Sequence, residues 1–343
     1  MKRILVTGGA GFIGHHFINY LLTHTDWHIT SLDRLDFSGN LNRLTNIVDE
    51  SNNRDKTKKR LKIIFHDLRA EINEYIGNNL GDFNYIIHMA ASSHVDRSIE
   101  DPMSFVLDNV VATCNILNYA RNFKKLEKFV YFSTDEVFGP APININYKER
   151  DRYNSTNPYS ATKAGGEELA VAFQNTYNMP VIVTHTMNVF GERQHPEKFI
   201  PMTIKNVRDN KLVSIHSNAK KTKAGSRHYI HAEDVANACL FLLKQEYASL
   251  KNEVDFGGAK CPKFNIVGPI ELDNHELAQE IAKAQNKKLN YEFVDFHSAR
   301  PGHDLRYALD GSLMKKLGWE PKKNVFERIK DVVNWSIKNE NWI

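Results

Sequence analysis

Short apolar segments alternate with longer amphipathic stretches through the first half of the 343-residue chain. The segments fall within the about 4 to 8 residues typical of strands and are rich in valine, isoleucine, phenylalanine and tyrosine. Several are apolar at nearly every position, as strands buried on both faces are. The expected strands are Arg3–Thr7, His28–Asp33, Leu61–His66, Tyr85–Ala90, Phe129–Ser133 and Val181–Thr186. Because strands that alternate with helices form parallel sheets, we predict an α/β fold, a doubly wound, Rossmann-like parallel sheet.

The pattern becomes irregular after Gly191, where prolines and polar stretches interrupt it. A helical segment at Ala232–Gln245 and an apolar run at Phe264–Val267 are expected to rejoin the main sheet. We therefore expect a main domain over residues 1–190, with returns at 228–246 and 262–268. A smaller lobe, interleaved with it, is expected over residues 191–343.

Three glycines, Gly8, Gly11 and Gly14, lie between the first strand and the apolar helix pattern that follows it. Residues without Cβ atoms let the chain bend tightly, approach a pyrophosphate and pack helix on strand. The helix N-terminus then presents free N–H groups and the positive end of its dipole to the phosphates. The sequence therefore predicts a dinucleotide site at this turn, which includes Phe12 and Ile13.

Asp33 ends the second strand, where a carboxylate accepts hydrogen bonds from the adenosine ribose hydroxyls. That position favours NAD over NADP. Arg34 follows directly and is the residue type that would instead bind a 2′-phosphate. Asp67 closes the third strand and is expected near the adenine, with an ordinary strand-end turn as the alternative.

A tyrosine and a lysine four residues apart are the next candidates for chemistry. Thr156 or Asn157 can cap a helix that begins at Pro158, so Tyr159 is expected in its first turn and Lys163 on the same face. A cation about 4 Å from the phenol is worth roughly 4 kcal/mol at intermediate dielectric, or about 3 pKa units, and the helix dipole acts in the same direction. We therefore expect Tyr159 to have a lowered pKa and to act as a base.

Two adjacent carboxyls, Asp135 and Glu136, follow Thr134 at the end of the fifth strand. In an open α/β sheet this edge borders the ligand crevice. One carboxyl can act as acid and its neighbour as base in an elimination if their environments separate their pKa values. Adjacent strand residues point to opposite faces, so both can serve only if the backbone becomes irregular there. An acidic surface turn is the alternative reading of the pair taken alone.

Taken together, these motifs resemble the extended short-chain dehydrogenase/reductase family. The run Ser-Thr-Asp-Glu-Val-Phe-Gly at residues 133–139 closely resembles the motif of its dTDP-glucose 4,6-dehydratases. Three other stretches resemble the same subfamily: Ala90–Ile99, Pro196–Pro201 and Arg300–Tyr307. The resemblance spans Ile4 to Trp319. It implies a nucleoside-diphosphate-glucose 4,6-dehydratase, an NAD-dependent lyase of deoxysugar biosynthesis, with residues 1–190 as the NAD-binding domain and 191–343 as the nucleotide-sugar lobe.

The resemblance also implies a role for each site residue. Tyr159 and Lys163 would serve oxidation at the sugar C4, with Thr134 holding the oxygen. Glu136 would then take the C5 proton while Asp135 protonates the leaving C6 hydroxyl, which yields a 4-keto-6-deoxy sugar nucleotide. The implied cofactor contacts include the glycine turn, Asp33, Asp67, Tyr159 and Lys163. The resemblance adds three further cofactor contacts: Leu68, Ala90 and Ala91. The implied substrate contacts, besides Thr134, are Ser93, His94, Asn188, Lys198, Arg227, Arg300 and His303.

Three positions depart from the usual pattern of that subfamily. Val189 stands where a second asparagine is common, Asp108 where threonine is common, and Ser92 where glutamate is common. The reaction is untouched by these departures, which bear instead on how tightly the cofactor binds and on the nucleotide base.

Composition and charge bear on which partners the protein can have: nucleic acid, a membrane, a metal ion or a second copy of the chain. A formal net charge of +4 is modest for this length, and the basic run Arg54–Lys62 is expected to be a solvated loop, so no nucleic-acid partner is expected. No apolar run approaches the about 20 residues that span a bilayer, and the chain starts without a secretion signal, so we expect a cytoplasmic protein. Three cysteines without CxxC spacing predict neither a disulfide framework nor a metal site. The segments Pro102–Asn122 and Pro158–Tyr177 are expected to form helices with broad apolar faces, and the resemblance implies a homodimer held by a four-helix bundle.

Two other functions remain open at this point. A sugar-nucleotide 4-epimerase or UDP-glucuronate decarboxylase would share the glycine turn and the Tyr159/Lys163 pair, but the Asp135/Glu136 pair argues against both. A non-catalytic NAD-binding regulatory protein would keep the fold without the reactive residues. The sequence leaves the nucleotide base open, with dTDP expected first and UDP second.

Overall fold

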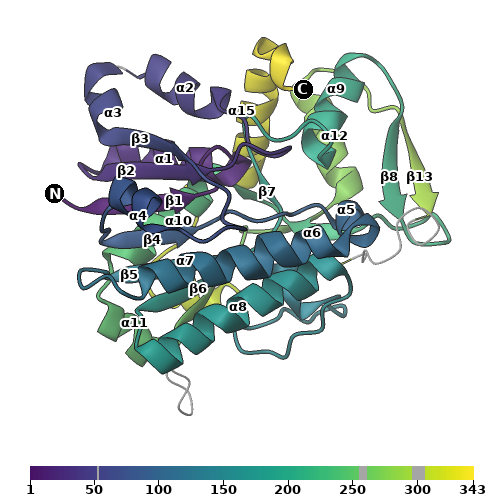
Figure 1. The fold of residues 1–343 in the computed structure, drawn as a ribbon. Helices are drawn as coiled ribbons and strands as arrows, with labels where there is room; N and C mark the ends of the chain where they lie inside the picture. Colours follow the sequence, from purple (N-terminus) through teal and green to yellow (C-terminus); the bar gives the residue numbers. More distant parts are fainter. Residues whose placement is uncertain (52–53, 255–260, 296–305) are drawn as a thin grey trace.

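A seven-stranded parallel sheet forms the centre of the molecule (Figure 1). The computed structural model describes residues 1–51, 54–254, 261–295 and 306–343. The strand order is β11-β6-β5-β4-β1-β2-β3, so the chain runs outward from β1 in both directions. The strands are β1 (Arg3–Thr7), β2 (His28–Asp33), β3 (Leu61–Phe65), β4 (Tyr85–His88), β5 (Lys128–Thr134), β6 (Val181–Thr186) and β11 (Lys263–Ile266). This reversal between β1 and β4 opens a crevice at the carboxyl ends of the strands, where ligands bind in such sheets.

Alternate side chains of each strand pack on opposite layers of helices, which gives the sheet two apolar cores. Ile4 and Val6 of β1 belong to one core, whereas Leu5 between them belongs to the other. Burial on both faces explains why the strands are apolar at nearly every position. The predicted α/β doubly wound fold is therefore confirmed.

Helices cover both faces of this sheet. The first core is completed by α1 (Phe12–His24), α2 (Asn42–Asp49), α10 (Ala232–Lys244), α11 (Tyr247–Val254) and α14 (Ser312–Lys316). The second is completed by α4 (Glu74–Leu80), α7 (Ala112–Ala120) and α8 (Pro158–Tyr177). Figure 1 shows α7 and α8 lying side by side along one face of the sheet.

A smaller group of elements lies beside the carboxyl edge of the sheet (Figure 1). Its apolar interior is built mainly by α9 (Phe199–Arg208), α12 (Asn274–Ala284) and α15 (Val325–Lys338). Three pairs of short strands accompany them: β7 (Val189–Phe190) with β10 (Ile230–His231), β8 (Val213–Ser217) with β13 (Tyr291–Asp295), and β9 (Ser226–His228) with β12 (Glu271–Asp273). Other short helices of the described residues are α3 (Arg54–Arg60), α5 (Val95–Glu100) and α6 (Pro102–Val106), with the 3-10 turns η2 (Asp135–Phe138) and η3 (Glu340–Trp342).

Two expectations change in detail. The basic run expected as a loop forms α3 and enters β3, and Arg60 donates hydrogen bonds to the carbonyls of Leu22, Thr25 and Trp27, so part of its charge serves internal packing. The helix expected at 102–122 is interrupted by a π-helical turn, η1 (Leu107–Val111). Such turns occur frequently at functional sites.

Within the described residues, no helix is both long enough and apolar enough to cross a bilayer.

Candidate active site

The glycine turn lies at the carboxyl end of β1, at the start of the crevice. Gly8 has a φ of +70°, and its amide donates to the carbonyl of Leu32 over 2.8 Å. A Cβ on Gly14 would lie 2.2 Å from the Gly8 carbonyl oxygen, so only glycine lets α1 approach the strand this closely. Gly11 is the N-cap of α1, and no side chain caps it. The free amides of this helix start fit a pyrophosphate, and so the turn fits NAD.

A pocket beside this turn, which encloses about 580 Å³ of partly open space, has the position of an adenosine pocket. Asp33 lines it, and its carboxylate accepts hydrogen bonds from the amides of Ala10 (3.0 Å) and Leu35 (2.9 Å). Burial raises the pKa of Asp33. The predicted contacts Asp67, Leu68, Ala90 and Ala91 line the same pocket.

A larger cleft, enclosing about 2080 Å³ of partly open space, continues from the glycine turn across the carboxyl edge of the sheet. The five expected catalytic residues all line it: Thr134, Asp135, Glu136, Tyr159 and Lys163. So do Gly8, Gly11, Phe12, Ile13 and Gly14. The fold therefore joins the dinucleotide turn and the reactive side chains in one continuous space.

The carboxyl pair reaches the cleft because the backbone turns at the end of β5. Thr134 is the N-cap of the 3-10 turn η2, which starts at Asp135. This confirms the irregular backbone that the pair required, and it places both carboxyls on the cleft instead of on opposite faces of a strand. Thr134 Oγ1 donates to Asp135 Oδ1 over 3.0 Å.

Helix α8 places the tyrosine and the lysine. Asn157 is its N-cap and forms a reciprocal capping box with Ser160, while Pro158 takes the first helical position. Tyr159 and Lys163 are one turn apart and both buried. Lys163 Nζ donates to the backbone carbonyl of Phe132 over 2.6 Å, which ties the helix to the end of β5.

The expected low pKa of Tyr159 is wrong for this arrangement. Burial, followed by the charge of Glu136, raises the pKa of Tyr159, against a hydrogen bond with Thr134 that lowers it. Burial also lowers the pKa of Lys163 to about 7. The lysine charge favours the phenolate, but burial removes water from both groups, and this desolvation is the largest effect on the pKa of each.

Asp135 is the carboxyl best suited to hold a proton at neutral pH. Burial, and after it the charge of Glu136, raise the pKa of Asp135 to about 7. Its Oδ2 is buried and has no hydrogen-bond partner among the described residues. An acid half protonated near pH 7 and oriented into the cleft can donate to a leaving hydroxyl.

Asp135 is therefore expected to destabilise the folded protein as the pH rises. Its folded pKa lies above its ordinary value of 3.8, so the unfolded chain loses this proton first, and the cost grows from about pH 4 to about pH 7. Replacing Asp135 with asparagine should raise the melting temperature at pH 8 by more than at pH 4, with a gain on the order of 4 kcal/mol at most. Thermal unfolding at both pH values tests this. Asp331→Asn, an exposed aspartate on α15, is the control, and an equal shift in both variants would contradict the argument.

A buried ionic cluster fixes α8 below the reactive residues. Glu167, one further turn along the helix, contacts His185 (3.1 Å), Lys263 (2.7 Å) and Ser133 (2.8 Å). Burial alone would raise the pKa of Glu167, but the charges and hydrogen bonds of His185 and Lys263 lower it below its ordinary value. The cluster links α8 to β5, β6 and β11, so Tyr159 and Lys163 stand on an element anchored from three strands.

The expected substrate contacts fall into two groups. The cleft is lined by Ser93, His94, Asn188, Lys198 and Arg227. Arg227 stacks on the ring of Tyr307 at 4.7 Å, and its charge acts on Asp135, so it lies on the reactive side of the cleft. Arg300 and His303 lie outside the described residues.

Sequence reasoning assigned no site role to two residues that contact this machinery. Asn157 Nδ2 donates to Glu136 Oε2 over 3.2 Å, so the helix cap also positions the expected base. Arg43 is buried at the cleft and donates to the carbonyls of Ala10 (3.0 Å) and Ser38 (2.7 Å). The cap itself was visible in the sequence, but nothing in the sequence marks either tertiary contact.

Within the described part of the chain, no three histidine, cysteine, aspartate or glutamate side chains are placed to hold a metal ion.

Comparison with known proteins points to nucleotide-sugar enzymes. The profile of the family described as GDP-mannose 4,6 dehydratase matches residues 5–332. A dTDP-glucose 4,6-dehydratase of Escherichia coli is 33% identical, over 99% of this chain and 95% of its own length. A low-salt glycan biosynthesis protein of Haloferax volcanii is also 33% identical, over 98% and 99% of the two chains.

Solved structures agree with these relatives. The dTDP-glucose 4,6-dehydratase DesIV of Streptomyces venezuelae, crystallised with NAD, superposes with a TM-score of 0.83 at 31% identity, covering 99% of this chain and 98% of its own. A UDP-glucuronic acid 4-epimerase of Bacillus cereus reaches a TM-score of 0.82 at 22% identity, over 98% and 99% of the chains. At that identity the epimerase shows only that the fold is shared.

Proposed function

The chain belongs to the GDP-mannose 4,6 dehydratase family, within the extended short-chain dehydrogenases/reductases, and from this premise we propose that it dehydrates a nucleoside-diphosphate-glucose. It is an NAD-dependent nucleotide-sugar 4,6-dehydratase, a lyase that forms the 4-keto-6-deoxy sugar and water. The observation that carries the proposal is the turn at the end of β5, which places Asp135 and Glu136 on the same cleft as Tyr159 and Lys163.

The first half of the reaction is oxidation at C4 of the sugar. NAD, which the glycine turn and Asp33 would hold, would supply a hydride acceptor for C4, a hydride donor for C6 and a positively charged ring. Tyr159 takes the proton of the 4-hydroxyl, and Thr134 holds the same oxygen. Because burial raises the pKa of Tyr159, the phenolate has to be stabilised as it forms. We propose that this is done by the Thr134 hydroxyl, which hydrogen-bonds Tyr159, and by Lys163, one helical turn away on the same cleft.

The second half is the loss of water across C5 and C6. The new 4-ketone acidifies the C5 proton, which Glu136 removes while Asn157 holds its carboxylate. Asp135, with a pKa of about 7, protonates the departing C6 hydroxyl. The C5–H and C6–O bonds break, a C5–C6 double bond forms, and the proton from Asp135 leaves in the water. When a hydride is added to C6, Glu136 returns its proton to C5, which completes the 4-keto-6-deoxy sugar.

We propose dTDP-glucose as the preferred substrate, with UDP-glucose second, because the dTDP-glucose dehydratases are among the relatives that match the whole chain. In this proposal residues 1–190 bind NAD, and residues 191–343 hold the nucleotide through Lys198 and Arg227, together with Asn188 from the end of the first domain. Arg300 and His303 are expected to assist. Cations and amides suit a diphosphate and a ribose.

The direct test is mass spectrometry after incubation of the protein and NAD with dTDP-, UDP-, GDP- and ADP-glucose. Loss of one water, about 18 mass units, with no net consumption of NAD is the expected result. An isomer of unchanged mass would instead support the 4-epimerase alternative, which shares the fold. Unchanged substrates across the panel, with NAD bound, would support the non-catalytic reading.

A homodimer is part of the proposal. Helices α6, α7 and α8 form one face, on which Met103 and Val106 are 64% and 36% exposed. A second copy of that face would cover these side chains in a four-helix bundle.

Light scattering at micromolar concentration should give twice the mass of the chain, and Val106→Asp should give the monomer. Met202→Asp, on α9, is the control; a monomeric unmodified protein would refute the dimer.

The cytoplasmic location expected from the sequence stays a prediction, which cell fractionation tests.

A further inference from the structure

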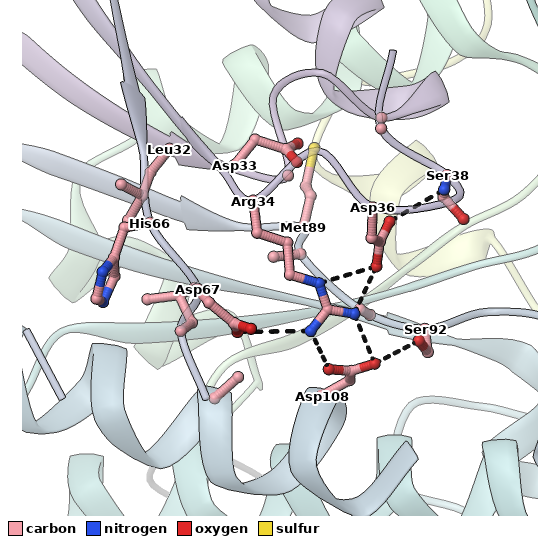
Figure 2. Close-up of a pocket in the computed structure, with 17 residues that line it drawn as sticks. Leu32, Asp33, Arg34, Asp36, Ser38, His66, Asp67, Met89, Ser92 and Asp108 are labelled. Carbon is pink, nitrogen blue, oxygen red and sulfur yellow. Dashed lines mark hydrogen bonds and ion pairs between the residues drawn. The ribbon is translucent and has the colours of Figure 1, made fainter. Parts of the chain in front are cut away.

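The adenosine pocket contains an ion cluster centred on Arg34. Figure 2 shows the Arg34 side chain extending away from Asp33 and ending among three other carboxylates. Its Nη1 lies 2.6 Å from Asp108 Oδ1 and 3.4 Å from Asp67 Oδ1, and its Nη2 lies 3.0 Å from Asp108 Oδ2. Both Nε (2.9 Å) and Nη2 also donate to Asp36. A guanidinium has five N–H donors, and these five hydrogen bonds use all of them.

Asp108 is the best-anchored carboxylate of this cluster. It is only 6% exposed, against 39% for Asp36 and 45% for Asp67, so solvent screens its charge least. It projects from the π-helical turn η1, binds Arg69 (2.6 and 3.1 Å) and accepts a hydrogen bond from Ser92 Oγ (2.7 Å). Burial alone would raise the pKa of Asp108, but the hydrogen bonds from Arg69, Arg34 and Ser92 lower it below its ordinary value. Asp108 is therefore ionised at neutral pH.

The cluster bears directly on the choice between the two nicotinamide dinucleotides. NADP differs from NAD by a phosphate on the adenosine 2′-oxygen, and an arginine next to the ribose-binding aspartate is the side chain suited to bind it. Arg34 follows Asp33 in sequence, yet its donors are all directed to carboxylates. Four aspartates and one arginine are among the described residues that line this pocket, so an added phosphate would meet an excess of negative charge.

We propose that Asp108 determines cofactor specificity by holding Arg34, which keeps the guanidinium from a 2′-phosphate. The inference rests on the proposed function only in requiring that the protein binds NAD. It assigns a role to a residue at which this chain departs from the usual pattern. Ser92, another position that departs from the usual pattern of the subfamily, donates a hydrogen bond to Asp108. The carboxylate that is common at position 92 is therefore replaced in this chain by a carboxylate at position 108.

The test is calorimetric titration of cofactor-depleted protein with NAD and with NADP. For unmodified protein, NAD should bind far more tightly. In Asp108→Asn, which keeps the side-chain shape, NADP affinity should rise at least about tenfold while NAD affinity stays within about threefold. Asp331→Asn removes a charge of the same kind from an exposed position on α15, away from the residues that line the pocket, and should change the NADP affinity by less than about threefold.

Two combinations show whether the gain has the proposed cause. Asp108→Asn with Arg34→Ala should lose the NADP affinity gained by Asp108→Asn, because the freed guanidinium is gone. Asp108→Thr should gain NADP affinity, as Asp108→Asn does. The double variant Asp108→Thr with Ser92→Glu should regain the preference for NAD, because the introduced glutamate supplies a carboxylate from the neighbouring position. The Asp108→Thr variant and its combination with Ser92→Glu also test the inference if Asp108→Asn fails to fold.

Each other outcome has a definite reading. An unchanged NADP affinity in folded Asp108→Asn and Asp108→Thr overturns the inference, as does a gain that persists without Arg34. Unmodified protein that binds neither dinucleotide would refute the proposed function instead, and equal affinity of the unmodified protein for both would refute NAD selection itself.

Discussion

The Tyr159→Phe variant is expected to bind NAD yet to form neither reduced NAD nor the keto sugar. The substitution removes only the hydroxyl of a buried side chain at the start of α8, and the capping box of Asn157 and Ser160 remains. Without that hydroxyl, nothing at this position takes the proton from the 4-hydroxyl, so oxidation and every later step should stop. Losing one positioned acid or base costs about 10² to 10⁴ in rate. Single-turnover absorbance of reduced NAD measures the step directly.

The same chemical change elsewhere separates this effect from a general loss of packing. Tyr119 on α7 is half-buried, and its hydroxyl bonds to the carbonyls of Gly77 and Gly81 away from the cleft. Tyr119→Phe should keep the full rate. NAD affinity measured by calorimetry shows whether the Tyr159 variant has kept its site. If Tyr159→Phe with intact NAD binding oxidised the sugar at the unmodified rate, Tyr159 would not be the base.

The Glu136→Gln variant is expected to divide the reaction at its midpoint. Glutamine keeps the shape and can still contact Asn157, but it cannot take the C5 proton. Oxidation at C4 should continue, so bound reduced NAD should accumulate while water loss slows by about 10² to 10⁴. Rapid mixing, with absorbance and quenched-sample mass spectrometry in parallel, follows both steps.

Two variants complete this experiment. Asp135→Asn should also slow elimination more than oxidation, since it removes the proton donor. Glu168→Gln, on the exposed side of α8, should change neither step. Formation of the 4-keto-6-deoxy product by Glu136→Gln at the unmodified rate would remove Glu136 from the elimination and return weight to the epimerase reading.

Local sequence patterns were sufficient for the strands of the main sheet and for the candidate catalytic residues that line its cleft. The fully apolar strands predicted a sheet buried on both faces, and Gly8 and Gly14 predicted the strand–turn–helix start, because close backbone approach excludes any other residue. Asn157 and Pro158 predicted where α8 begins. Such signals are readable because their physical causes act over a few neighbouring residues.

The sequence by itself thus determined the fold class and the dinucleotide turn and named candidates for the reactive residues, whereas tertiary structure decided the charge states and partners of these side chains. The lowered pKa expected for Tyr159 was wrong, because burial is a property of the folded cleft and outweighs one lysine. Arg34, adjacent to Asp33 in sequence, is held by Asp108 from a helix 74 positions away. Desolvation and ion pairing depend on distances between segments remote in sequence, so no local pattern specifies them.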